Sequence, residues 1–300
     1  MHNNPPKKRP AHIALAQYGG FCYGVKRAVE AVERALQEAT GPVYTLGEII
    51  HNQTVVEELE RRGVRSIDSL AEAQQGATVI IRAHGCVPEI FAQAQNRGIV
   101  LIDATCPDVR KVQLLAQEHA GQNQALYIVG KPEHPEVMGI AGWSGGRAVV
   151  LPSLAAVEAL PQVDRAAVLS QTTMKRETFV SIVEALRKKC GQLTVCDTIC
   201  KTTQRRQQEA FELSKKSDAV VVVGGKHSSN TRELYEIAKR NCKNVWIVEK
   251  AEDILLENPS FYGIIHIIAG ASTPSWMMME VFTRMNELEK IGRASCRERV

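Results

Sequence analysis

The stretch AVVVVGGKHSSN, residues 219–230, is an unbroken apolar run that ends abruptly in glycine, lysine and small polar residues. Its consecutive valines leave no polar face, which is typical of a strand buried on both faces of a parallel sheet. The residues that follow, TRELYEIAKR, predict a helix. A strand that leads directly into a helix is the repeating element of α/β proteins.

Five further apolar runs have the same form, each ending in glycine or small polar residues: HIALAQ (12–17), TVIIRAHG (78–85), ALYIVGKPEH (125–134), AAVLSQTT (166–173) and GIIHIIAGAST (263–273). Helical patterns separate them, and the apolar residues after Cys22 form a regular helical stripe. The alternation predicts an α/β fold. In such sheets ligands bind at the carboxyl ends of the strands.

A faint internal repeat suggests more than one α/β unit. AHG (83–85), GKPEHPE (130–136) and GGKHSSN (224–230) each follow a strand and each contain a histidine. We interpret them as three similar units of roughly 90 residues, at 12–104, 105–197 and 198–288. Chance resemblance among α/β units is the alternative. Residues 1–11 read as a disordered basic tail. The segment 291–300, IGRASCRERV, breaks the preceding pattern, and we expect it to be non-native, with the native C-terminus unknown beyond about residue 290.

Composition narrows the functional classes. The 300 residues are 44% hydrophobic and 23% charged, as in ordinary globular proteins, and the net charge of +4 suits an acidic small ligand. That charge is too weak to indicate nucleic-acid binding. No apolar run approaches the roughly 18 residues of a membrane span, and no apolar signal segment is present. We therefore expect a cytoplasmic protein, in which disulfides are rare.

Three of the eight cysteines occupy matching positions: Cys22 in GFCYGV, Cys106 in DATCPDVRKV and Cys200 in DTICKTTQRRQ. Each precedes a helical run, and successive members lie 84 and 94 positions apart. A helix N-terminus lowers a thiol pKa and stabilises the thiolate. Three converging thiolates would form a soft site for an iron–sulfur group, zinc or copper with one open metal position. The alternative is that each cysteine is a small buried residue, as we assign Cys86, Cys190 and Cys242.

Polar residues at predicted strand ends or before predicted helices suit an anion. They are His51, His84, His134, Ser228, Ser229, Asn230 and Ser272. Donors at helix N-termini bind anions, and imidazolium groups pair with phosphate oxygens. Taken singly, each has a plainer interpretation as a helix cap or a structural histidine. Neither a P-loop nor a dinucleotide-binding glycine motif is present. A redox enzyme of this kind would take its electrons from a protein donor.

Glu136 follows His134 by two residues and is a candidate proton donor, with a solvated surface acid as the alternative. Thr172 lies at another predicted strand end. It would orient a substrate hydroxyl or merely cap the next helix.

Taken together, the motifs GFCYGVKRAV, EIIHN, AHG, DATCP, HPEV, QTT, DTICKTTQRRQ, SSN and AGAST resemble the 4-hydroxy-3-methylbut-2-enyl diphosphate reductase family over residues 12–288. The resemblance implies three similar α/β units, with small mainly parallel sheets, in a pseudo-threefold arrangement around one [4Fe-4S] cluster. It implies that Cys22, Cys106 and Cys200 ligate three irons. The fourth iron, not ligated by cysteine, would take the substrate hydroxyl.

The same resemblance implies the reaction, a two-electron reductive dehydroxylation of (E)-4-hydroxy-3-methylbut-2-enyl diphosphate to isopentenyl and dimethylallyl diphosphate. The implied diphosphate ligands are His51, His84, His134, Ser228, Ser229, Asn230 and Ser272. Glu136 and Thr172 match the proton-relay pair, and Thr203 matches a pocket-lining position. Ferredoxin or flavodoxin would supply the electrons. The alternative hypothesis is a zinc-stabilised binding module for a phosphorylated small ligand.

Overall fold

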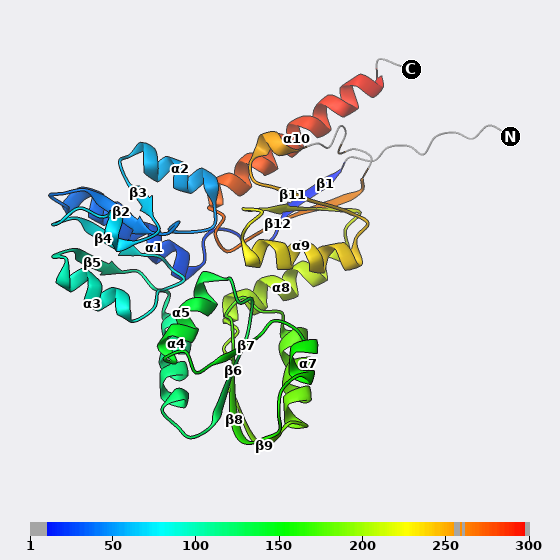
Figure 1. Ribbon diagram of the computed structural model, residues 1–300. Coiled ribbons are helices and arrows are strands. Elements are labelled where there is room, and N and C mark those ends of the chain that lie inside the picture. The colour runs from blue at the N-terminus through cyan, green and yellow to red at the C-terminus, as the bar shows by residue number, and fades with distance from the viewer. Residues whose placement is uncertain (1–10, 255–258, 260–261, 298–300) are drawn as a thin grey trace. The chain divides into compact units, whose positions relative to one another are not determined.

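The computed structural model describes residues 11–254, 259 and 262–297 (Figure 1). The chain forms two compact units. The larger unit is residues 22–204, and the smaller unit combines the described residues before 22 with those from 205 onward. The expected tail at 1–11 lies outside the described residues except for Ala11. Helix α10 (Ser275–Arg297) continues through most of the segment 291–300, whose last three residues also lie outside.

The larger unit contains two four-stranded sheets, both wholly parallel. The first has the order β3-β2-β4-β5, from β2 (Val43–Leu46), β3 (Arg65–Ile67), β4 (Thr78–Ile81) and β5 (Val100–Asp103). The second has the order β7-β6-β8-β9, from β6 (Ala125–Val129), β7 (Val149–Leu151), β8 (Val163–Ser170) and β9 (Cys190–Val195). The central strands pair so that Leu46 lies opposite Ile81 and Val129 opposite Ser170, which brings their carboxyl ends level.

Helices cover both faces of the first sheet. Tyr44, Leu46 and Val79 pack toward α3 (Glu89–Asn96) and the short 3-10 helix η1 (Leu70–Glu72). Helices α1 (Tyr23–Glu38) and α2 (Gln53–Arg61) also contact the sheet's strands. The predicted stripe on α1 is confirmed, because Ala28, Val32 and Ala35 are buried.

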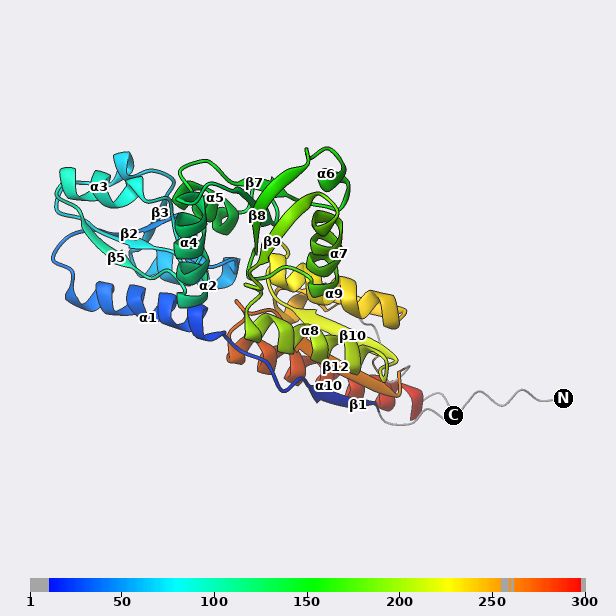
Figure 2. The same cartoon turned by 90° about the horizontal axis from the view of Figure 1, so that it is seen from below.

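The second sheet is layered in the same way. Helices α4 (Pro107–Ala120) and α5 (Pro135–Trp143) cover one face, and α6 (Ala155–Glu158) and α7 (Arg176–Arg187) cover the other (Figures 1 and 2). Alternate residues of each strand enter the two cores: Val129 faces α7, whereas Ile128 faces α4 and α5. Burial on both faces accounts for the continuous apolar runs in the sequence.

The smaller unit holds one parallel sheet of order β1-β12-β10-β11, from β1 (His12–Leu15), β10 (Ala219–Val223), β11 (Asn244–Val248) and β12 (Ile264–Ala269). Helix α10 packs on one face through Met277, Val281 and Met285. Helices α8 (Lys201–Ser214) and α9 (Ser229–Asn241) pack on the other. The 3-10 helix η2 (Ala251–Asp253) follows β11.

All three sheets share one topology. Numbered by position, the strands of each sheet run in the order second, first, third, fourth, and the first three follow one another along the chain. In the smaller unit β1 fills the fourth position by pairing with β12, so residues 12–15 belong to the third sheet. The expected α/β class with three similar parallel units is therefore confirmed. The proposed division at 104/105 and 197/198 stays a prediction.

Candidate active site

The predicted binding residues lie at equivalent places in the three sheets. The loops after the first strands carry His51, His134 and Ser228, and Ser229 and Asn230 begin the helix that follows Ser228. The loops after the third strands carry His84, Thr172 and Ser272. First and third strands are neighbours in every sheet, and in both sheets of the larger unit their crossovers leave in opposite directions along the sheet. Such switch points open a crevice at the carboxyl ends of parallel strands. The topology therefore explains why these side chains collect at strand ends.

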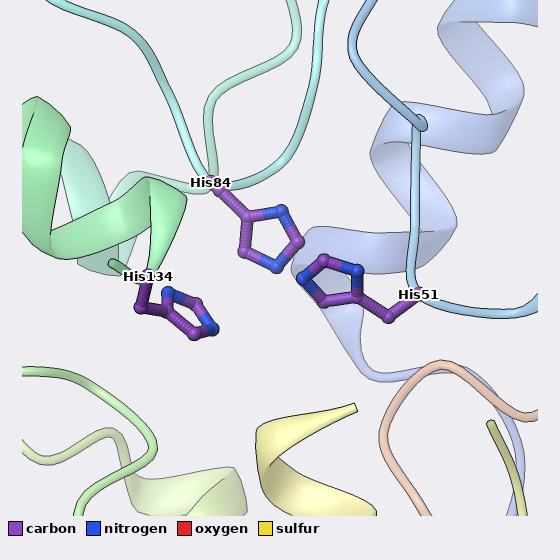
Figure 3. A group of neighbouring side chains, drawn as sticks. All are labelled: His51, His84 and His134. Atoms are coloured by element: carbon purple, nitrogen blue, oxygen red, sulfur yellow. The ribbon is translucent and has the colours of Figure 1, made fainter. Parts of the chain in front are cut away.

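The three predicted histidines of the larger unit form one cluster (Figure 3). The ring centroids of His51 and His84 lie 4.5 Å apart, and those of His134 lie 5.8 and 5.4 Å from them. One ring nitrogen from each lies within 4.8 Å of the other two. His51 and His84 come from the first sheet and His134 from the second, so folding joins residues that are 83 positions apart in sequence.

The contacts of each histidine Nδ1 indicate which ring nitrogen carries the proton. Nδ1 of His134 accepts the backbone N–H of Glu136 at 3.2 Å, so its neutral ring carries the proton on Nε2. Nδ1 of His84 is buried without a hydrogen-bond partner, and an unpaired acceptor costs less there than an unpaired N–H. Nδ1 of His51 lies 3.7 Å from a Glu48 carboxylate oxygen. His134 therefore offers an N–H donor at Nε2, and a neutral His84 would do the same, which suits an anion better than a metal ion.

Burial keeps two of these rings uncharged. It lowers the pKa of His84 well below its usual value, with further lowering from the charges of His51 and His134. It lowers the pKa of His134 to about 3, again helped by His51. Burial therefore favours the neutral form of both rings in the ligand-free protein, and pairing of imidazolium groups with a bound phosphate stays a prediction.

Glu136 is buried, with 1% of its surface exposed, so the interpretation as a solvated surface acid is wrong. One carboxylate oxygen accepts the backbone N–H of Thr172 at 2.6 Å and the other accepts its hydroxyl at 2.8 Å. Burial raises the pKa of Glu136 to about 7, although both Thr172 hydrogen bonds oppose the rise. A carboxyl group of this pKa is suited to donating a proton near neutral pH.

The three predicted cysteines are also equivalent in the fold. Each follows the fourth strand of a sheet: Cys106 after β5, Cys200 after β9 and Cys22 after β1. Cys22 and Cys106 are the N-cap residues of α1 and α4, and Cys200 immediately precedes α8. The prediction that each cysteine opens a helix is confirmed.

The larger unit brings the three thiols into one electrostatic neighbourhood, since burial first and, to a lesser extent, the charge of Cys22 raise the pKa of both Cys106 and Cys200. A Cβ atom at Gly24 would lie 2.5 Å from the Cys106 sulfur, so α1 and Cys106 are in close contact. Among described residues, the three thiols do not form a group compact enough for a single ion, as the histidines do. This soft donor set fits a multi-atom iron–sulfur group better than one zinc ion.

The thiol pKa values differ from the sequence expectation. Burial raises the pKa of Cys106 to about 11, and the N–H groups of Asp108 and Val109 lower it only in part. Burial also raises the pKa of Cys200, against hydrogen bonds from the Thr203 hydroxyl at 3.0 Å and amide at 3.3 Å. In the metal-free protein desolvation therefore outweighs the helix N-terminus. The start of each helix provides N–H groups that donate hydrogen bonds to the sulfur, and the thiols ionise when a metal replaces the proton.

Backbone bonds connect the candidate metal ligands to the polar residues. The Cys200 N–H donates to the Thr172 carbonyl at 3.0 Å, and the Cys106 N–H donates to Ala83, next to His84, at 3.0 Å. A continuous path therefore runs from Cys200 through Thr172 to Glu136, and Glu136 in turn bonds His134. This hydrogen-bonded chain contains, in order, a candidate metal ligand, a candidate proton donor and a residue that can donate a hydrogen bond to an anion.

In the smaller unit, Ser228 caps α9 by accepting the Thr231 N–H at 3.3 Å. Capping had been the plainer interpretation of Ser229 and Asn230, but the cap is Ser228. Both polar side-chain atoms of Asn230 are buried without a hydrogen-bond partner. Ser272 is buried on the loop after β12, the strand next to β10. A buried amide with both ends unpaired indicates a place for a ligand or ordered water.

Sequence reasoning missed the residues that join the two sheets of the larger unit. The Cys86 carbonyl accepts the indole N–H of Trp143 at 2.9 Å and the amide of buried Gln113 at 3.5 Å. Cys86 follows His84 by two residues, while Trp143 ends the helix that begins beside His134. These contacts hold the two histidine-bearing loops together. No motif marks them, since a lone tryptophan and glutamine on helices read as ordinary core or surface residues.

Fold and site together define a class: a parallel α/β protein with three partly buried thiols, a cluster of imidazole rings suited to an anion, and an adjacent buried carboxyl. These are features of metal-dependent enzymes that act on small phosphorylated compounds. Residues 13–286 match the family model described as "LytB protein". The chain belongs to the LytB protein family.

Two bacterial relatives carry the same name. A protein of Caldanaerobacter subterraneus subsp. tengcongensis named 4-hydroxy-3-methylbut-2-enyl diphosphate reductase is 42% identical over 280 residues, covering 92% of this chain and 97% of the relative. A Thermoanaerobacter protein (strain X514) of the same name is 40% identical with the same coverage. The solved structure of the E-1-hydroxy-2-methyl-but-2-enyl-4-diphosphate reductase from Plasmodium falciparum matches with TM-score 0.87 at 28% identity, covering 92% of this chain and 88% of that one. A second solved structure, of (E)-4-hydroxy-3-methyl-but-2-enyl diphosphate reductase, "the terminal enzyme of the non-mevalonate pathway", matches with TM-score 0.69 at 37% identity, covering 92% and 99%. The family expected from the motifs is confirmed.

Proposed function

We propose that this protein is an oxidoreductase that converts (E)-4-hydroxy-3-methylbut-2-enyl diphosphate to isopentenyl diphosphate and dimethylallyl diphosphate. Two electrons and two protons enter, and the bond between carbon and the hydroxyl oxygen breaks. One proton leaves with the oxygen as water, and the other ends on carbon. The reaction is a step of isoprenoid precursor biosynthesis by the methylerythritol phosphate route, as the names of the relatives imply.

The observation that carries the proposal is the bonded path from Cys200 through Thr172 and Glu136 to His134. This path of hydrogen bonds joins a candidate metal ligand, a carboxyl that holds its proton near neutral pH, and a histidine that can donate a hydrogen bond to an anion. This is the order that the substrate requires, because its hydroxyl and diphosphate lie at opposite ends of a short carbon chain.

Under this proposal the diphosphate is held by His51, His84, His134, Ser228, Ser229, Asn230 and Ser272. The inward N–H groups of His84 and His134 donate to phosphate oxygens without first taking up protons. The unpaired amide of Asn230 supplies a further donor. Binding energy from this remote group fixes the reacting end of the substrate.

Glu136 serves as the proton donor and Thr172 as its positioning partner and as a ligand of the substrate hydroxyl. Departure of an unprotonated hydroxide is unfavourable, so an acid that is protonated near neutral pH lowers the barrier. The Thr172 hydroxyl can donate to Glu136 or turn to the substrate oxygen, because a hydroxyl rotates to suit its partner.

Cys22, Cys106 and Cys200 would hold one [4Fe-4S] cluster, leaving one iron without a cysteine ligand. When bound, such a group supplies single electrons in succession and a Lewis-acidic iron. The chain's own residues position its ligands: the Thr203 hydroxyl and amide bond the Cys200 sulfur, and Gly24 leaves room for Cys106.

The electron donor would be a reduced ferredoxin or flavodoxin, since no nucleotide-binding glycine motif supplies a bound electron carrier. We propose the cytoplasm as its location, in keeping with the seven cysteines from Cys22 to Cys242, all of which are free thiols. Among the described helices, none has the length and apolar character to cross a membrane.

Anaerobic reconstitution with iron and sulfide tests the proposal. The loaded protein should be brown and, given a strong reductant, should consume the hydroxylated diphosphate and release both C5 products. Glu136→Gln should keep colour and diphosphate binding but lose turnover. Glu133→Gln, an exposed neighbour two residues before Pro135, is the matched control and should turn over normally. A colourless protein that contains about one zinc per chain and no iron would instead support the zinc-stabilised binding module.

A further inference from the structure

Arg27 lies between the two loops that carry Cys22 and Cys106. It is five residues after Cys22, in the second turn of α1. Its Nη1 donates to the Thr105 carbonyl at 2.7 Å, and its Nη2 donates to the Asp103 carbonyl at 3.5 Å. Thr105 is the residue directly before Cys106. One guanidinium therefore links the helix that Cys22 opens to the segment that ends at Cys106.

The two carbonyls need a donor from outside the sheet. β5 is an edge strand, paired on one side only with β4. Carbonyls two residues apart on an extended chain point the same way, so those of Asp103 and Thr105 both face away from β4. Unpaired backbone carbonyls in a partly buried segment are costly. The planar fork of arginine supplies two donors at once, whereas a lysine ammonium is a compact point charge.

The rest of the segment is already fixed to its own sheet. The Cys106 N–H donates to the Ala83 carbonyl at 3.0 Å, which continues the pairing of β4 with β5. The Asp103 carboxylate accepts the Thr105 N–H at 3.0 Å, bonds the Thr105 hydroxyl and pairs with Arg110. These bonds position Cys106 within the first sheet, but none of them reaches α1. Arg27 provides the hydrogen bonds that position α1 against this segment.

The contact between α1 and Cys106 leaves little tolerance for movement. A Cβ atom built on Gly24 would lie 2.5 Å from the Cys106 sulfur and 2.9 Å from its Cβ. Gly24 is two residues after Cys22, in the first turn of the same helix. A shift of α1 along the segment would thus change the separation of the two sulfurs directly.

We propose that Arg27 is a positioning residue that sets the separation of the Cys22 and Cys106 sulfurs before any metal is bound. The inference rests on the proposed function, because it gives those two thiols their role as cluster ligands. When the Cys22 and Cys106 sulfurs are already positioned, binding of the iron–sulfur group does not also have to order α1. Loss of the Arg27 bonds would leave the segment intact in its sheet but allow α1 to move.

The test compares Arg27→Gln and Arg27→Lys with a matched control, Lys26→Gln. Lys26 is the adjacent residue, and its exposed side chain lies 3.8 Å from Glu30 on the same helix. In the metal-free protein, a thiol-bridging reagent such as dibromobimane is added and the Cys22–Cys106 cross-link is quantified by peptide mapping. In the reconstituted protein, the loss of visible absorption under an iron chelator is timed. Circular dichroism establishes that each variant is folded.

Losing this pair of partly buried hydrogen bonds should lower the cross-linking rate and raise the bleaching rate by about tenfold in Arg27→Gln. Arg27→Lys, which keeps the charge but not the fork, should show most of that effect, and Lys26→Gln none. If either folded Arg27 variant cross-links and bleaches at the wild-type rates, the inference is overturned. If wild-type protein binds no iron, the proposed function fails, and the cross-linking rate still decides the role of Arg27.

Discussion

Replacing Glu136 with glutamine is expected to stabilise the metal-free protein, but only at neutral and alkaline pH. Glu136 is buried and accepts two hydrogen bonds from Thr172. Glutamine has nearly the same shape, keeps an oxygen for the Thr172 N–H and never carries charge. The substitution therefore removes the cost of a buried carboxylate without opening a cavity.

The magnitude follows from the shift of the Glu136 pKa, from 4.5 for an ordinary glutamate to about 7 in the fold. Below pH 4.5 both states are protonated and the group contributes its full stabilisation. As the pH rises to about 7, the unfolded chain releases the proton that the folded protein still holds, so the free energy of unfolding falls. At about 1.4 kcal/mol per pKa unit, the total loss is about 3 kcal/mol above pH 7, which Glu136→Gln should recover.

Urea unfolding of both proteins at about pH 5 and about pH 8 measures this difference. Burial lowers the pKa of His84 and of His134, so both proteins lose stability as the pH falls below 6.5, and that loss cancels in the comparison. Glu133→Gln, at an exposed position, should show no gain that grows with pH. A gain for Glu136→Gln that is equal at the two pH values, or a loss that grows with pH, would refute the reasoning.

Three further outcomes are expected. Trp143→Phe removes the indole N–H that bonds the Cys86 carbonyl at 2.9 Å and should lower the free energy of unfolding by about 1 kcal/mol in urea titrations; an unchanged midpoint would mean that the bond adds nothing. Gly24→Ala places a methyl group 2.5 Å from a candidate ligand sulfur and should sharply reduce iron bound per chain after reconstitution, whereas a full iron content would show that the sulfur moves aside freely. Because His134 donates while neutral, calorimetric affinity of the metal-free protein for inorganic diphosphate should change less than about tenfold between pH 6 and pH 8; a steeper decline with rising pH would indicate that charged imidazolium groups dominate.

The strands that could be predicted from sequence are those with long apolar runs. β4, β6, β8, β10 and β12 lie inside their sheets, and their continuous valine, isoleucine and leucine runs reflect burial on both faces. β3, β7 and β11 lie at sheet edges and were not predicted: β3 has a single apolar residue, and the apolar runs of β7 (148–151) and β11 (245–248) are only four residues long. β2 was also missed, although it is buried, because its four residues include Tyr44 and Thr45.

The internal repeat was detected with the wrong correspondence. Sequence similarity had matched the segments around His84 and His134, but His84 follows a third strand and His134 a first strand. The structural counterpart of His134 in the first sheet is His51, and that of His84 in the second is Thr172. Histidine content misled the comparison, because equivalence of position is set by strand order, which local sequence does not encode.

The sequence by itself determined the α/β class, the helix starts at three cysteines and the residue types able to hold an anion. These are local properties, fixed by apolar periodicity, capping and motif spacing. Only the tertiary structure decided that Glu136 is buried and bonded to Thr172, that His84 and His134 stay neutral, and that burial raises the pKa of the Cys106 and Cys200 thiols. Solvation and Coulomb energies depend on neighbours that come from other sheets and distant residues, so charge states are settled only once the chain has folded.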